Sequence, residues 1–110
     1  MIKDDLAYKD HILDCIRKIK EFSKGLSLEE FKANELVQDA IIRNIEIIGE
    51  ASKKISKNTK QTYYKIPWKE IAGMRDKLIH DYLGVDVTVV WETIHSDIPM
   101  LEELISEIEK

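Results

Sequence analysis

The sequence contains few of the residues that interrupt helices or crosslink a chain: four glycines, two prolines and one cysteine among 110 residues. The single cysteine, Cys15, excludes an internal disulfide and a zinc site made of clustered cysteines. Because Cys15 lies between Ile12 and Ile16, a buried thiol is favoured over a reactive one. The scarcity of glycine and proline, with a charged fraction of 35%, favours a helical protein over a sheet protein or a disordered tail.

Long apolar runs are also missing. No run could span a bilayer, and residues 1–5 lack the apolar core of a signal peptide, so we expect a cytoplasmic protein without a membrane partner. The sequence has no glycine-rich phosphate loop, no His-Glu-x-x-His pair and no nucleophile elbow around a serine. Its histidines, His11, His80 and His95, are scattered. We therefore expect neither a metal site nor a cofactor held by this chain.

What the sequence does contain is a repeat of apolar residues at spacings of three and four, the period of an amphipathic helix. No linker or internal repeat interrupts it, so residues 1–110 are expected to form a single domain. The predicted fold class is all-α, an up-and-down helical bundle of four main helices plus short helical turns. The main helices are predicted over residues 3–24, 35–56, 67–83 and 87–109.

Local signals indicate where these helices begin and end. Gly25 is expected to adopt the left-handed conformation after the first helix. Ser27 and Glu30 have the spacing of a capping box that starts a short helical turn. Asn34 and Asp86 are expected to cap the helices that follow them.

Two residues inside the predicted helices are unfavourable there. Gly49 costs about 1 kcal/mol of helix propensity relative to alanine, and could be there to let another helix approach closely. Pro99 removes a backbone donor and is expected to kink the last helix. In the polar connection between residues 57 and 66, one helical turn is expected around residues 62–64.

The net charge of −4 conceals an uneven distribution. Residues 86–110 hold seven acidic residues and one basic residue, whereas residues 53–77 hold eight basic residues and two acidic ones. The basic segment contains Tyr63, Tyr64 and Trp68, and basic residues interleaved with aromatics can hold phosphates and stack on bases. The alternative is a solubilising loop beside a core tryptophan. The candidate RNA-binding residues are Lys53, Lys57, Lys60, Lys65, Lys69 and Lys77.

Residues 73–84 concentrate the candidate chemistry, because Arg75, His80 and Tyr82 follow one another there. On one ideal helix Asp76 and His80 share a face, so the carboxylate can orient the imidazole. Arg75 and His80 are five residues apart and differ by about 140° around the helix axis. They can act on one phosphate if the arginine curls round, if the helix end distorts, or if a second copy of the chain supplies the partner.

An arginine and a histidine suffice to cleave RNA without a metal. A histidine can take the proton of the 2′-hydroxyl or protonate the leaving oxygen, and an arginine can stabilise charge on the phosphate oxygens. The alternative is that His80 is a helix-end histidine and Arg75 a surface base. Four polar residues of the second main helix also have two possible interpretations. They form an ordinary solvated face, or some of them support the site: Arg43, Asn44, Glu46 and Glu50.

The residues from Arg75 to Tyr82 resemble the Arg-x4-His-x-Tyr motif of the HepT-like branch of the HEPN ribonucleases. The resemblance covers essentially the whole chain. It implies a helical bundle that dimerises through the motif helix. It also implies a metal-independent endoribonuclease that is the toxin of a type VII-like toxin–antitoxin pair. The matching segments outside the motif are residues 43–51, 66–68, 71–74, 84–86, 90–91 and 98–99.

The same resemblance implies roles for single residues. Arg75 and His80 would be the catalytic pair, and Asp76 the supporting polar residue. Tyr82 would be the residue to which an MntA-type nucleotidyltransferase antitoxin attaches AMP, with ATP used by that partner and not by this chain. The attached phosphate would repel RNA from the cleft. Two alternatives remain, a non-catalytic binding subunit of a minimal nucleotidyltransferase and a purely structural helical dimer.

Overall fold

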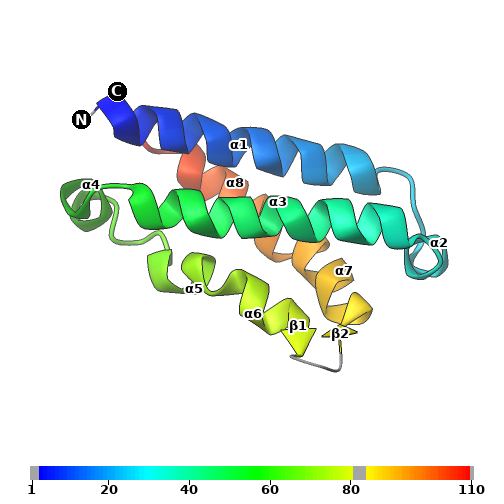
Figure 1. Ribbon diagram of the computed structural model, residues 1–110. Coiled ribbons are helices and arrows are strands. Elements are labelled where there is room, and N and C mark those ends of the chain that lie inside the picture. Colours follow the sequence, from blue (N-terminus) through cyan, green and yellow to red (C-terminus); the bar gives the residue numbers. More distant parts are fainter. Residues whose placement is uncertain (1–2, 81–83, 110) are drawn as a thin grey trace.

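The computed structural model describes residues 3–80 and 84–109, with the backbone alone described for Lys3, Ile79 and His80. The elements in chain order are α1 (Lys3–Ser23), α2 (Leu28–Lys32), α3 (Glu35–Lys54), α4 (Lys57–Thr62), α5 (Trp68–Ala72), α6 (Met74–Leu78), β1 (Ile79–His80), β2 (Gly84–Val85), α7 (Val87–His95) and α8 (Asp97–Ser106) (Figure 1).

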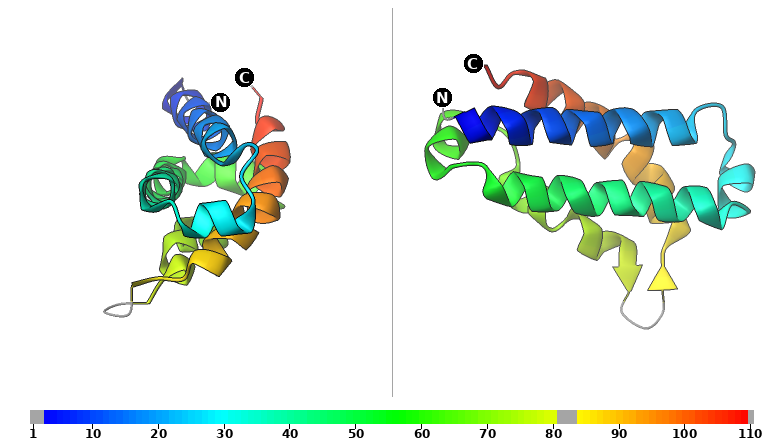
Figure 2. Two further views of the ribbon diagram at one scale, coloured as in Figure 1. Left: turned by 90° about the vertical axis from the view of Figure 1, so that its right-hand side faces the viewer. Right: turned by 45° about the horizontal axis from the view of Figure 1, so that its top comes forward.

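The helices form an up-and-down bundle, so the all-α prediction is confirmed. Helices α1 and α3 lie side by side and antiparallel, α5 and α6 run along the other side of α3, and α7 with α8 covers the back (Figures 1 and 2). No helix in the described part of the chain is long and apolar enough to cross a membrane. The core is rich in isoleucines without exposed surface: Ile12, Ile16, Ile41, Ile45, Ile98 and Ile105.

The residues predicted to begin and end the helices are found in those roles. Gly25 has a φ of 77°, in the left-handed region. Ser27 and Glu30 form the complete capping box, with hydrogen bonds of 2.9 and 3.1 Å. The side chains of Asn34 and Asp86 each accept a hydrogen bond from the backbone amide three residues later, at 3.1 and 3.2 Å. These ends are encoded locally because each bond spans one helical turn.

Gly49 lets α3 and α5 approach each other closely, as the sequence suggested. A Cβ atom at Gly49 would lie 3.3 Å from the carbonyl oxygen of Ala72 and 3.4 Å from that of Ile71. Both neighbours are backbone atoms, which cannot swing aside as a flexible side chain can. The segment that leads into the motif is therefore fixed against α3 by a contact between two backbones.

The last predicted helix is interrupted near Pro99, as predicted. Helix α7 ends at His95 and α8 begins at Asp97, so the break lies at Ser96, in the turn that precedes Pro99. Pro99 lacks the amide that would bond to the carbonyl of His95, and its ring crowds that carbonyl, so the preceding turn opens. Pro99 itself lies in the first turn of α8, where an amide has no partner within the helix.

Candidate active site

The segment predicted to form one helix over residues 67–83 forms, in its described part, α5, α6 and strand β1 instead. Strand β1 pairs antiparallel with β2, and His80 lies opposite Gly84. Gly84 has a φ of 84°, a conformation that other residues rarely adopt. The amide of Asp86 donates to the carbonyl of Leu78 at 2.8 Å, which satisfies an acceptor at the end of α6. At residues 79 and 80, strand pairing with β2 therefore replaces the predicted helix.

One prediction made from helical geometry is therefore wrong: Asp76 and His80 do not share a helix face, because α6 ends at Leu78. The separation of about 140° between Arg75 and His80 applies only to one continuous helix. Of the three arrangements considered for this pair, the structure has the distorted helix end, so this separation gives no reason to invoke a second copy of the chain. The side chain of His80 lies outside the described part of the structure, and Tyr82 lies outside the described residues altogether.

Helix α6 presents Arg75 to solvent. Met74 and Leu78 lie one turn apart and are buried, with 6% and 0% of their surface exposed. The three residues between them consequently face outward. The side chain of Arg75 is 48% exposed and that of Asp76 is 81% exposed. An arginine held this way is open to a ligand while its backbone is anchored in the core.

The guanidinium of Arg75 lies beside two carboxylates. Its Nε is 3.2 Å from Oε2 of Glu46 on α3, and its Nη1 is 3.7 Å from Oδ1 of the adjacent Asp76. The side chain of Glu46 is 32% exposed, so the contact is at the surface and not in the core. Asp76, predicted to support the site through His80, thus contacts the motif arginine in this structure.

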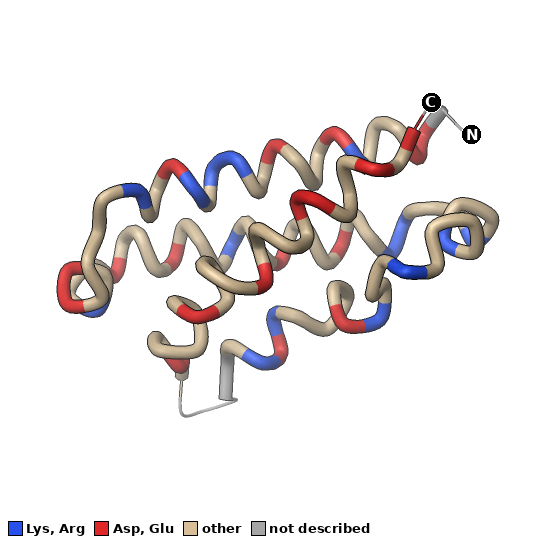
Figure 3. The backbone as a smooth tube through the Cα atoms, turned by 180° about the vertical axis from the view of Figure 1, so that it is seen from behind, with Lys and Arg blue, Asp and Glu red and all other residues tan. Residues whose placement is uncertain are grey.

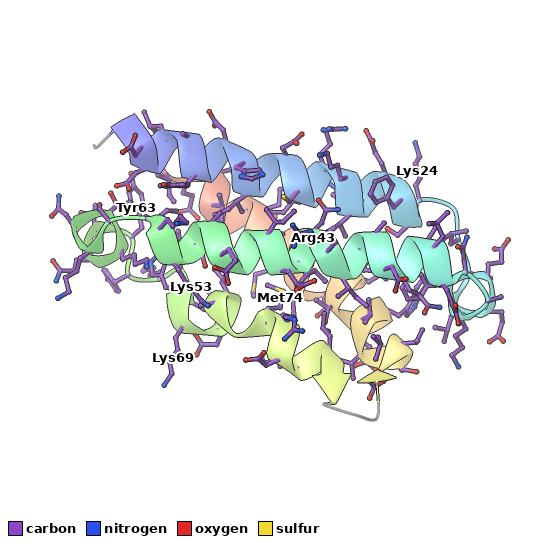
Figure 4. All side chains as sticks on the ribbon, in the orientation of Figure 1. Lys24, Arg43, Lys53, Tyr63, Lys69 and Met74 are labelled. Atoms are coloured by element: carbon purple, nitrogen blue, oxygen red, sulfur yellow. The ribbon has the colours of Figure 1, made fainter. Side chains whose placement is uncertain are left out.

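The four polar residues of α3 have different surroundings. Glu46 contacts the candidate site through Arg75. The buried Asn44 donates its amide to the carbonyl four residues earlier in its own helix, at 2.8 Å. Glu50 forms a surface ion pair with Lys53 at 3.4 Å. Arg43 is exposed midway along α3 (Figure 4). The supporting role considered for this group therefore falls on Glu46.

The candidate RNA-binding lysines extend from the end of α3 to α6, whereas acidic residues follow α7 and α8 (Figure 3). Within the lysine-bearing region, Lys53 projects from α3 and Lys69 from the neighbouring α5 (Figure 4). The ammonium of Lys60 lies 5.8 Å from the ring centroid of Trp68, whose indole donates to the carbonyl of Tyr63 at 3.1 Å. Trp68 is thus partly buried and covered by a lysine, and the RNA-binding role of the lysines stays a prediction. The exposed lysines of the set are Lys53, Lys57, Lys65, Lys69 and Lys77.

The start of the lysine-bearing segment is fixed by a buried acid that the sequence did not reveal. Asp5, only 2% exposed, accepts hydrogen bonds from the amide and hydroxyl of Ser56 at 2.9 and 2.6 Å, and from the hydroxyl of Thr59 at 2.5 Å. Burial acts to raise the pKa of Asp5, but these hydrogen bonds outweigh it and hold the pKa below its usual value. Ser56 also caps α4 (Lys57–Thr62), which therefore lies earlier in the chain than the turn expected around residues 62–64.

The other groups that could carry chemistry are a possible metal site and the thiol of Cys15. Among the described residues, no three His, Cys, Asp or Glu side chains are grouped so that they could hold a metal ion. Cys15 is buried in the core, as predicted, and burial raises the pKa of its thiol. A buried thiol with a raised pKa has little reactive thiolate at neutral pH.

Comparisons with known proteins cover almost the whole chain. The profile of the family described as "Ribonuclease HepT-like" matches residues 12–108. "Putative RNase TTE0752" of Caldanaerobacter subterraneus subsp. tengcongensis is 46% identical over 107 residues, which are 97% of this chain and 96% of that protein. "Probable ribonuclease HepT" of Thermococcus cleftensis is 46% identical over 103 residues, which are 94% of each chain. No solved structure matches significantly.

Proposed function

Because this chain belongs to the Ribonuclease HepT-like family, we propose that it is an endoribonuclease that cleaves RNA with Arg75 and His80 and without a metal ion. The proposal rests on one observation, the way in which the backbone and the guanidinium of Arg75 are held in the fold. Its backbone is anchored by two buried neighbours, while its guanidinium is half exposed and held at 3.2 Å from Glu46. A half-exposed arginine on an anchored backbone can bind a phosphate with little loss of freedom.

In the proposed reaction, the 2′-hydroxyl of one nucleotide attacks the adjacent phosphorus. The bond from that phosphorus to the 5′-oxygen of the next nucleotide breaks, which leaves a 2′,3′-cyclic phosphate and a 5′-hydroxyl. One proton leaves the 2′-oxygen and one arrives at the 5′-oxygen, and His80 serves one of these two transfers. Arg75 stabilises the charge that develops on the non-bridging oxygens. The lysines from α3 to α6 contact the RNA backbone.

We further propose that the enzyme is the toxin of a type VII-like toxin–antitoxin pair and works as a homodimer joined through the motif segment. An MntA-type nucleotidyltransferase would silence it by transferring AMP from ATP to the hydroxyl oxygen of Tyr82, with release of pyrophosphate. The new phosphodiester brings negative charge to a residue two positions from His80, so it would repel the RNA phosphates. The basis for the dimer is the family resemblance, since the geometric reason for it does not apply.

The test is cleavage of a defined single-stranded RNA by the purified protein in EDTA, compared with Arg75→Ala and His80→Ala. We expect the wild type to produce fragments ending in a cyclic phosphate and each variant to lose most of the activity. Arg17→Ala is the matched control for Arg75→Ala, because Arg17 is another half-exposed arginine and pairs with Asp14 and Glu21 on its own helix. Cleavage that persists in His80→Ala at the wild-type rate would contradict the role given to His80.

The second candidate function is a non-catalytic subunit that presents a groove and Tyr82 to a nucleotidyltransferase. The two carboxylates beside Arg75 favour it, because they offset the positive charge that an RNA phosphate would meet. Expression of the chain without its partner separates the two functions. The toxin inhibits growth and the binding subunit does not, and Arg75→Ala relieves inhibition only if cleavage causes it.

A further inference from the structure

Glu46 and Arg75 are far apart in the sequence but lie within ion-pair distance in the fold. The closest approach joins Oε2 of Glu46 to Nε of Arg75, at 3.2 Å. Nε is the guanidinium nitrogen nearest the aliphatic part of the side chain. This contact is an ion pair, and on the other side of the group Nη1 lies 3.7 Å from Asp76, so the guanidinium is held between two carboxylates.

The backbone that carries Glu46 is among the most firmly packed parts of the fold. Ile45 and Ile48, which flank it on α3, have no exposed surface. One turn further, Gly49 meets the backbone of α5 closely enough that an added Cβ would be 3.3 Å from a carbonyl oxygen. Glu46 therefore projects from a fixed frame toward a short helix, α6, that is itself anchored at Met74 and Leu78.

We propose that Glu46 is a positioning residue for the RNase reaction, one that holds the guanidinium of Arg75 in the orientation that meets the reacting phosphate. This inference rests on the proposed function, because it gives Glu46 a role in the same site. An arginine side chain has several rotatable bonds, and a partner that fixes it before RNA binds removes part of the entropy lost in the transition state.

The opposite role of the same contact is masking, in which the carboxylate of Glu46 competes with RNA for Arg75. The two roles predict different kinetics. Loss of a positioning contact lowers kcat, because the arginine is then misplaced when charge develops on the phosphate. Loss of a masking contact lowers KM and leaves kcat unchanged, since the arginine becomes more available to ground-state RNA. The position of the contact at Nε, away from the tip of the side chain, favours positioning.

The experiment measures kcat and KM of the full-length protein on a short single-stranded RNA. For Glu46→Gln we expect kcat to fall roughly tenfold to a hundredfold, the range for a misplaced catalytic group, with KM changed less than about threefold. Glu46→Asp keeps the charge on a shorter side chain and should recover part of the loss. Glu50→Gln on the same helix should match the wild type, because Glu50 does not pair with Arg75.

A second comparison isolates the pair. Arg75→Ala removes the guanidinium that Glu46 contacts. In the Arg75→Ala background, Glu46→Gln should therefore change the residual kcat by less than about twofold, whereas independent residues would show the full single-variant loss again. Thermal unfolding of every variant shows whether a loss of kcat reflects a loss of folded protein.

Each result has one meaning. An active wild type with an equally active Glu46→Gln overturns the positioning role and leaves the proposed function intact. Glu46→Gln with a lower KM and an unchanged kcat also overturns it and identifies masking. A wild type that cleaves no RNA overturns the proposed function and this inference together, so the two failures are distinguishable.

Discussion

Two carboxylates connect remote parts of this fold, and they do so in opposite ways. Asp5 is 2% exposed and accepts three hydrogen bonds that tie α1 to the start of α4. Glu46 is 32% exposed and contacts Arg75 across the surface between α3 and α6. The carboxylate of Asp5 is surrounded by hydrogen-bond donors of the protein. The carboxylate of Glu46 contacts the guanidinium of Arg75, which is also exposed to solvent.

The contrast separates a structural tie from the contact that we propose to be functional. A buried carboxylate with three donors stabilises the fold, because removing it leaves those donors without their partner. A surface ion pair contributes little to stability, since water and salt screen it. In the role proposed for it, the ion pair matters because it orients the guanidinium of Arg75. Changes at Asp5 should therefore alter stability, and changes at the Arg75 site should alter activity.

The largest expected effect is on activity at the contact proposed to be functional. Arg75→Ala should lower RNA cleavage about a hundredfold to a thousandfold, as loss of one charge-stabilising donor does in other enzymes. Because the side chain is 48% exposed, the free energy of unfolding should change by no more than about 0.5 kcal/mol. Cleavage kinetics and urea unfolding of the same samples check both parts. A large loss of stability would mean that Arg75 is structural.

The next effect is on stability at the structural tie. Asp5→Ala should lower the free energy of unfolding by about 3 kcal/mol, because the amide and hydroxyl of Ser56 and the hydroxyl of Thr59 lose a charged acceptor. Asp4→Ala is the matched control, since Asp4 is the neighbouring acid and is exposed. Urea unfolding measures the difference. Equal stability of the two variants would contradict the structural role of Asp5.

A third change tests the frame that carries Glu46. Gly49→Leu should lower the free energy of unfolding by about 2 kcal/mol, because its side chain would overlap the backbone of α5. It should also lower cleavage, since α6 follows α5 and would be displaced. Gly73→Ala is the control, because a Cβ there would meet its nearest atom at an ordinary 3.6 Å. Normal cleavage by a folded Gly49→Leu variant would show that the frame does not set the site.

The smallest effect is a difference in pH dependence. The pKa of Asp5 is lower in the folded protein than its ordinary value of 3.8, so its stabilising contribution is complete above that value. As the pH falls through the folded-state pKa, the contribution is lost. Between pH 5 and pH 2, about the range in which carboxylates titrate, the wild type should therefore lose more stability than Asp5→Asn. Thermal unfolding across that range measures this, and parallel curves would contradict it.

Much of the fold could be predicted because its determinants are local. The periodicity of the apolar residues predicts α1 and α3, which are observed over Lys3–Ser23 and Glu35–Lys54. The caps at Ser27, Asn34 and Asp86 follow from bonds between residues three apart. Helical periodicity fails in the motif segment, where β1 pairs with β2 in place of further helical turns. The helix-face geometry assigned to Asp76 and His80 fails with it.

Residue patterns alone predict the helical class, the capped helix ends and the buried thiol of Cys15, and they contain the motif with Arg75, His80 and Tyr82. Tertiary structure alone decided which partners remote residues meet. Asp5 and Ser56 are 51 positions apart, and no periodic pattern pairs them. Glu46 reaches Arg75 because Gly49 lets two backbones approach within contact distance. Local hydrogen bonds can be predicted from neighbouring residues, whereas such contacts depend on how whole helices pack.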